Sequence, residues 1–265
     1  MVYEFFDGPL SPIVSALVWS ILIWLVTYSI VFKTKIFNCL ISNPLSPPFL
    51  ALPALMFAFL MGFMASESWQ NYSQAKTSII NETAAIERIL NIPLKPGVFQ
   101  VKSNDYVKSY LQSVLDDEWG AKHNQSSSEE AHESLNLLEL NMWQASDACS
   151  DGLLPKASCT SSVSAAAYIK AIDDLRVARE QRLSLGYQSS RTFRWFLGII
   201  LGLISAISVA AVHKHNQKTG TIALTLYCLS MWMAFSMVTL NIHPYKWSEV
   251  VKPTPLISIL EKIKH

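Results

Sequence analysis

Five arginines precede an apolar run in the last third of the chain. Of the side chains in this sequence, they are the clearest candidates for binding ions. They are Arg176, Arg179, Arg182, Arg191 and Arg194. Guanidinium groups bind anions, so several copies of the chain around one axis would form a basic vestibule beside a membrane. The alternative is that these arginines pair with acids, for which the candidates are Glu82, Glu87, Asp173 and Asp174. Counting outward from the membrane predicts an ion pair of Glu82 with Arg176 and Arg179.

Two cysteines lie ten positions apart on either side of a turn-rich segment. Cys149 and Cys159 bracket Ser150–Ser158, which contains Gly152 and Pro155. In an oxidising compartment this spacing predicts a disulfide that closes a short loop. The alternative is a pair of free thiols.

A stripe of small residues runs along the apolar segment after the arginines. Its members follow one another at four-residue spacing and are Gly198, Gly202, Ala206 and Ala210. Small side chains at that spacing let two membrane helices approach closely. The pattern leaves open whether the contact lies within a subunit or between subunits.

The sequence contains no motif typical of a metal site, an enzyme or a nucleic-acid-binding protein. His213 and His215 have no Cys or carboxylate near them, so no metal or cofactor is predicted. The sequence contains neither a Gly-x-Ser-x-Gly motif nor a phosphate-binding loop, which argues against an enzyme. The formal net charge of +1 argues against a nucleic-acid partner.

Apolar segments dominate the chain, which is 51% hydrophobic and only 15% charged. Crossing a bilayer takes about 20 apolar residues. Four windows qualify: Ile13–Phe32, about Phe49–Ala65, Phe196–Val212 and Thr221–Ile242. The sequence therefore predicts an all-α integral membrane protein that contacts the lipid bilayer through four transmembrane helices. The short second window could instead be a re-entrant segment.

Two short loops carry lysines and no acid. Lys33 and Lys35 follow the first window, and Lys214 and Lys218 lie between the third and fourth. Short basic loops stay in the cytoplasm. We therefore expect a multi-pass protein of the cell inner membrane, with both termini and the large domain outside the cytoplasm.

The domain organisation follows from these windows. The predicted parts are transmembrane helices 1 and 2 (1–66), an extracytoplasmic helical domain (67–191), transmembrane helices 3 and 4 (192–242) and an extracytoplasmic amphipathic tail (243–265). The second transmembrane helix is expected to continue outward to about Leu90. Three more helices are expected over about Asn104–Trp119, Glu129–Ala145 and Ser162–Tyr187. The tail is expected to dock on the domain, and the alternative is that it lies in the membrane interface.

Motifs in one order along the chain carry a family resemblance. Glu82 lies within Trp69–Leu90, Arg179 and Arg182 precede the third window, and Asn-Ile-His-Pro-Tyr ends at Tyr245 before Val-Lys-Pro-Thr-Pro-Leu at 251–256. The chain thereby resembles the bestrophin-like domain family of bacterial membrane proteins. That family usually carries an acidic residue and a glycine around its tail motif, whereas His243 and Lys246 stand here.

The resemblance implies the membrane topology, a homo-oligomer and, by analogy with bestrophins, an anion channel. Together with the arginines it favours an oligomeric channel with a basic extracytoplasmic vestibule. The alternative is a non-enzymatic accessory or scaffolding subunit whose helical domain binds a protein partner. The spans contain no Asp, Glu, Lys or Arg, which argues against a proton-driven transporter.

Overall fold

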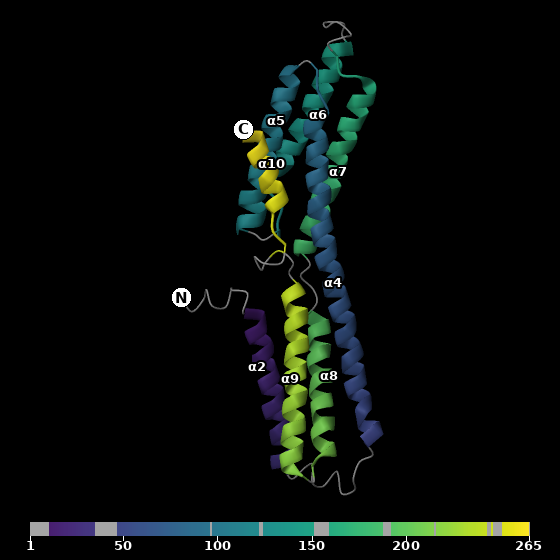
Figure 1. Cartoon of the computed structure of the whole chain (residues 1–265), viewed down its shortest axis with the longest axis vertical. Helices are drawn as coiled ribbons and strands as arrows, with labels where there is room; N and C mark the ends of the chain where they lie inside the picture. Colours follow the sequence, from purple (N-terminus) through teal and green to yellow (C-terminus); the bar gives the residue numbers. More distant parts are fainter. Residues whose placement is uncertain are drawn as a thin grey trace. The chain divides into compact units, whose positions relative to one another are not determined.

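The computed structural model describes residues 11–34, 47–95, 97–121, 124–150, 159–187, 192–214, 216–242, 245 and 251–264. Within these ranges every regular element is a helix, so the predicted all-α class is confirmed (Figure 1). The elements are α2 (Ser11–Tyr28), the π-helical turn η1 (Ser29–Lys33), α4 (Pro47–Asn91), α5 (Gly97–Ser113), the π-helical segment η2 (Val114–Ala121), α6 (Glu129–Ser150), α7 (Ser162–Tyr187), α8 (Thr192–Val212), α9 (Gln217–Ile242) and α10 (Thr254–Lys264).

The chain divides into two compact units. Unit 1 combines residues 1–71 with 189–243, and unit 2 combines 72–188 with 244–265. The division falls inside α4, which is one continuous helix, as the sequence predicts. The predicted boundaries after residues 66, 191 and 242 concern the membrane edge, and they stay predictions.

Unit 1 contains the apolar helices. Among the described residues, four helices are long and apolar enough to cross a membrane: Ile13–Lys33, Ala51–Asn91, Arg194–Val212 and Gln217–Thr239. Each overlaps a window predicted from the sequence, so the number of candidate spans agrees with the prediction. A helix suits this setting because it satisfies its backbone hydrogen bonds internally.

In the core of unit 1, α9 packs against α2 and α8. Phe57 and Met61 of α4 pack with Met231 and Phe235 of α9, and the rings of Phe57 and Phe235 lie 5.9 Å apart. The hydroxyl groups of these helices mostly donate to carbonyls of their own helix. Examples are Ser205 to Leu201, Ser208 to Ile204, Thr225 to Thr221 and Ser230 to Leu226.

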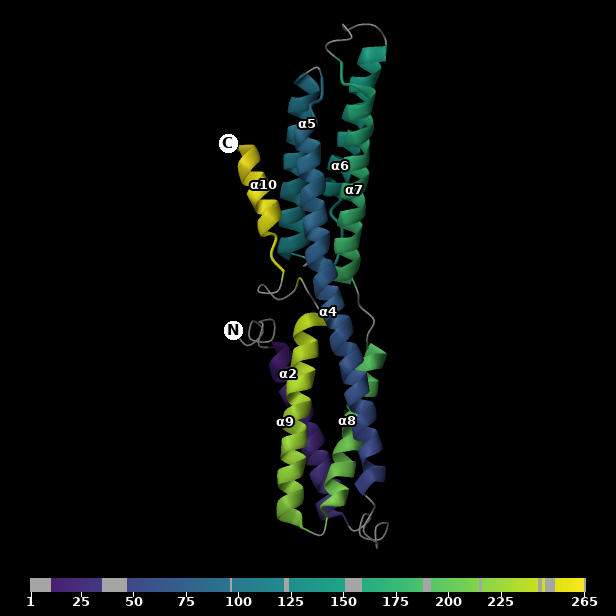
Figure 2. The ribbon, with the colours of Figure 1, turned by 45° about the vertical axis from the view of Figure 1, so that its right-hand side comes forward.

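Unit 2 is a helical bundle made of α5, η2, α6, α7 and the part of α4 that follows Asn71. Its largest fully buried apolar side chains come from all of these elements except η2. They are Ile86, Ile89, Tyr110, Leu111, Leu135, Leu138, Met142, Tyr168, Ile172 and Leu175. The C-terminal helix α10 lies beside α5 (Figures 1 and 2) and buries Leu256 and Ile259 in the same core. The predicted docking of the tail is therefore confirmed.

Local signals explain where two helices of unit 2 begin. Ser128 precedes α6 and its Oγ accepts a hydrogen bond from the Ala131 amide, while Ser161 caps α7 through the Ser164 amide. The bounds of α7 match the prediction. Helix α5 begins at Gly97, seven residues earlier than expected. Within these added turns, polar Ser103 is buried and shares a 2.5 Å hydrogen bond with the Tyr168 hydroxyl.

Candidate functional site

A buried ion pair joins α4 to α7 inside unit 2. The Arg182 guanidinium binds both carboxylate oxygens of Glu82, through Nε at 2.7 Å and Nη2 at 3.1 Å. Both side chains are completely buried. The two-point geometry is the strong form of an arginine–carboxylate contact.

A second buried pair lies beside the first. Nη2 of Arg179 donates to Oε1 of Glu118 at 2.6 Å, and Nη2 of Arg182 donates to the other Glu118 oxygen at 2.7 Å. Glu118 comes from η2, so the four side chains connect three helical segments. Their formal charges cancel. Glu82, Glu118, Arg179 and Arg182 are hereafter the charge cluster.

Neutral donors complete the hydrogen bonding of both acids. The Tyr110 hydroxyl donates to Glu82 Oε1 at 2.6 Å, and the Ser128 amide donates to Glu118 Oε1 at 2.9 Å. The Ser128 carbonyl accepts from Arg179 at 3.0 Å. Buried charges are tolerated when they are paired and hydrogen-bonded in this way.

The surroundings keep Glu118 and Arg182 ionised. Burial by itself would raise the pKa of Glu118, but the charge of Arg182 and hydrogen bonds from Arg179 and the Ser128 amide outweigh it and lower that pKa. The pKa of Arg182 is raised despite burial, mainly because Glu82 is close. Burial and the neighbouring Glu82 raise the pKa of Tyr110 well above its usual value, so its hydroxyl keeps its proton.

Aromatic rings connect the cluster to the tail of the chain. The Arg182 guanidinium lies 6.0 Å from the Trp119 ring centre, and the Tyr245 ring packs edge-on against Trp119 at 5.2 Å. The Tyr245 hydroxyl is 3.3 Å from Ser78 Oγ on α4. The last residue of the Asn-Ile-His-Pro-Tyr motif thus anchors the tail beside the cluster.

The arginines have other partners than the sequence predicted, which was an ion pair of Glu82 with Arg176 and Arg179. Glu82 pairs with Arg182, three residues further along α7 than Arg179, because a helix face repeats every three to four residues. Arg176 instead contacts Glu139 of α6 at 2.7 Å. Glu87 lies 3.7 Å from Lys262 of α10.

The burial of Arg179 and Arg182 also removes them from a vestibule. Their guanidinium groups point to carboxylates inside unit 2 and are at most 3% exposed. They cannot concentrate anions in water from that position. Arg191 lies outside the described residues, and Arg194 belongs to unit 1.

Glu118 is the site residue that the sequence interpretation missed. It follows two acids, and a run of three acids usually marks a solvated surface. The available signal was Trp119 beside it, because a large apolar neighbour at the end of an amphipathic helix indicates that the segment turns inward.

The small-residue stripe on α8 is used inside unit 1. A Cβ on Gly198 would lie 3.5 Å from the Phe235 ring, and one on Gly202 would lie 2.9 Å from Met231 Sδ and 3.4 Å from the Phe57 ring. Ala206 and Ala210 are completely buried. The stripe therefore lets α8 pack closely against α9 and α4 within one subunit.

A different stripe of small residues faces outward on α4. Ala58, Gly62 and Ser66 follow one another at four-residue spacing and are all exposed. A Cβ on Gly62 would meet nothing within 4 Å. Beside this stripe stand three large exposed side chains, Met56 (62%), Phe59 (61%) and Phe63 (73%), which are hereafter the apolar ridge.

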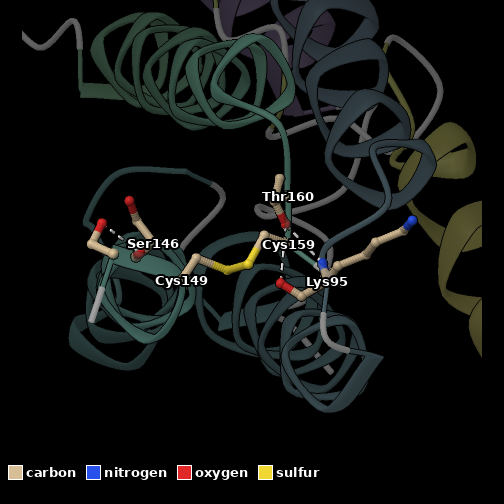
Figure 3. Close-up of a disulfide and its surroundings, with 6 residues drawn as sticks. Lys95, Ser146, Cys149, Cys159 and Thr160 are labelled. Carbon is tan, nitrogen blue, oxygen red and sulfur yellow. Dashed lines mark hydrogen bonds between the residues drawn. A yellow bond between two sulfur atoms is a disulfide. The ribbon is translucent and has the colours of Figure 1, made fainter. Parts of the chain in front are cut away.

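Cys149 and Cys159 are joined by a disulfide in the structure, with their Cα atoms 5.7 Å apart (Figure 3). Cys149 lies in the last turn of α6. Next to Cys159, the Thr160 hydroxyl accepts from the Lys95 amide at 2.8 Å and donates to the Lys95 carbonyl at 3.2 Å. The segment before α7 is thus fastened both to α6 and to the connection between α4 and α5.

Metal ligation finds no support in the part of the chain that the structure describes. No group of three or more His, Cys, Asp or Glu side chains is arranged there to hold a metal ion. The acids of the charge cluster are already bonded to arginines. The cluster thus holds the helices of unit 2 together.

Comparison with known proteins agrees with the resemblance seen in the sequence. The model of the bestrophin-like domain family matches residues 13–256. A point mutant of a bacterial bestrophin homologue from Klebsiella pneumoniae has a similar structure, with a TM-score of 0.65 and 14% identity over 95% of this chain and 96% of that chain. A second mutant of a Klebsiella pneumoniae homologue gives a TM-score of 0.65 at 13% identity, over 96% of each chain.

A crystal structure described only as a membrane protein gives a TM-score of 0.67 at 13% identity, over 96% of this chain and 97% of that chain. At these identities the likeness concerns the fold. No curated protein matches the chain in sequence. The predicted family resemblance is confirmed.

Proposed function

Since the chain belongs to the bestrophin-like domain family, we propose that several copies assemble in the membrane around an ion-conducting pore that favours anions. The observation that carries this proposal is the outward face of α4. It combines a free stripe of small residues with an adjacent ridge of large apolar ones.

The small stripe supports assembly. In a membrane, close helix packing depends on small residues because lipid is as apolar as the side chains. The stripe on α8 is already occupied by side chains of its own unit, whereas nothing lies near Gly62. A helix of a second copy is the partner that the Ala58, Gly62 and Ser66 stripe suits.

The apolar ridge supports a pore. Met56, Phe59 and Phe63 lie on successive turns next to the small stripe, so helices that meet through the stripe would direct the ridge toward a shared axis. Rings of apolar side chains form narrow passages that open and close by wetting. No charged residue is needed at the centre of such a passage.

The preference for anions follows from the cost of losing water in an apolar passage. That cost falls as ionic radius grows, and chloride, bromide and iodide ions are larger than sodium or potassium ions. This reasoning replaces the arginine vestibule expected from the sequence as the source of preference, because Arg179 and Arg182 are buried and paired.

We also propose that unit 2 and both termini lie outside the cytoplasm, in a protein of the inner membrane. Lys33, Lys214 and Lys218 favour a cytoplasmic position for the loops beside them. The Cys149–Cys159 disulfide suits an oxidising compartment. Two cysteines, Cys39 and Cys228, lie outside the disulfide pair, and both are replaced by serine for this test. In that background a membrane-impermeant maleimide should label Lys218→Cys only after the cells are permeabilised. Labelling of intact cells would reverse the assignment.

A second candidate function rests on unit 2. Leu140 and Trp143 are adjacent on α6 and half exposed, at 51% and 50%. Exposed aromatic and aliphatic side chains on one helix face are typical of protein-binding surfaces. This face would serve an accessory subunit that binds a protein partner.

The test compares Gly62→Leu with Gly97→Leu in detergent and in planar bilayers. A Cβ would meet nothing within 4 Å at either glycine, so both variants should fold. Wild type and Gly97→Leu are expected to be oligomers that give discrete currents. Gly62→Leu should run as a monomer and give no current, because leucine fills the stripe.

Two outcomes would contradict the channel. One is a folded wild-type oligomer that stays silent, after which capture of partners by the Leu140 and Trp143 face becomes the next experiment. The other is a Gly62→Leu protein that remains oligomeric and conducts like wild type.

A further inference from the structure

An ion pair of unit 1 joins α4 to the start of α8. Arg194 donates from Nη1 to Oε2 of Glu67. The side chains remain partly open to water, with Glu67 34% and Arg194 50% exposed. Unlike the charge cluster of unit 2, this pair can therefore interact with dissolved ions.

The pair stands at one end of the apolar ridge. Glu67 lies one helical turn after Phe63 on α4. The two helices run antiparallel here, because Gly198 faces Leu60 and Gly202 faces Phe57 further along. An ion that leaves the ridge at this end would next meet Glu67 and Arg194.

Other charges are scarce in unit 1. Within its described residues, Glu67 is the one acid, and the remaining basic side chains are Lys33, Lys214 and Lys218. Those lysines belong to the opposite helix ends, at the close of α2, after α8 and at the start of α9. Among these described residues, Glu67 and Arg194 are thus the charged side chains that determine the electric field at the Phe63 end of the apolar ridge.

We propose that the Glu67–Arg194 pair adjusts charge selectivity at this mouth of the pore. This inference rests on the proposed channel function and adds the contribution of two residues to the preference that the apolar passage provides. Arg194 attracts small inorganic anions, and Glu67 offsets part of that attraction. Repeated around an axis, the pair would form a ring of charged side chains, and rings of charge at pore mouths select ions by sign.

The test measures reversal potentials in planar bilayers between unequal concentrations of KCl. Glu67→Gln is expected to raise the chloride-to-potassium permeability ratio about fivefold or more, because each subunit then presents an uncompensated arginine. Arg194→Gln should lower the ratio by a similar factor. Both effects should shrink at high salt, since exposed charges are screened.

Two controls separate charge from damage to the fold. The double exchange Glu67→Arg with Arg194→Glu keeps the pair and should restore a ratio near that of wild type. Arg88→Gln removes one member of a similarly exposed pair in unit 2, where Arg88 lies 3.0 Å from Asp174, and should leave the ratio unchanged.

The outcomes distinguish this inference from the channel function itself. A conducting wild type with unchanged ratios in both single variants would overturn the role of the pair while the channel stands. Equal shifts in Arg88→Gln would likewise refute it. A folded wild type without any current would refute the channel, and the selectivity role with it.

Discussion

Arg182→Ala is expected to lower the free energy of unfolding by about 3–5 kcal/mol, because it leaves buried carboxylates without their main partner. Glu82 would lose both of its guanidinium hydrogen bonds, and Glu118 would lose one of its two arginines. The space vacated by a fully buried side chain adds to the loss. Chemical unfolding of the detergent-solubilised protein, followed by helix content, measures the effect.

Arg88→Ala is the matched control for this prediction. Arg88 also pairs with an acid between α4 and α7, but the side chains of Arg88 and Asp174 are 62% and 42% exposed. Water screens such a pair, so the loss should be about 0–1 kcal/mol. Equal losses in Arg182→Ala and Arg88→Ala would mean that the charge cluster does not hold the helices of unit 2 together.

The double variant Phe59→Ala with Phe63→Ala is expected to raise single-channel conductance about threefold or more. In the proposed channel, truncating two rings of the apolar ridge would widen the narrowest passage and ease its wetting. Both rings are more than half exposed in one subunit, at 61% and 73%, so their removal leaves the core of unit 1 intact. Single-channel recording in planar bilayers gives the measurement.

Met233→Ala on α9 provides the comparison, because Met233 is 63% exposed and also lies in an apolar helix of unit 1. Met233 lies outside the apolar ridge, so its truncation should leave conductance as in wild type. A conductance that stays the same in the Phe59 and Phe63 variant would place the ridge away from the ion path. An equal rise in the conductance of Met233→Ala would mean that the apolar ridge has no special role in conduction.

Apolar runs, helix caps and helical spacing of apolar residues made most of the fold predictable. Apolar runs without charge identified the four candidate spans, since about 20 such residues suffice to cross a bilayer. The limits of α7 were also predictable, because a serine cap precedes it and apolar residues recur at three and four along it. The order of the motifs was enough to identify the family.

Which charges meet was not predictable, because that depends on rotation and offset of whole helices. A shift of three residues on α7 exchanges Arg179 for Arg182 as the partner of Glu82. Glu118 reaches the cluster only because η2 turns inward beside Trp119. Neither the offset nor the turn leaves a periodic signal in the sequence.

Sequence patterns were enough to predict the helical class, the number of candidate spans, the family and a disulfide between Cys149 and Cys159. These follow from local composition and spacing, which act over a few turns of helix. Tertiary structure alone decided that the stripe on α8 is filled within the subunit, while the one on α4 stays open. The physical reason is that a small residue leaves space on a helix, but only the neighbouring helices determine whether that space is occupied.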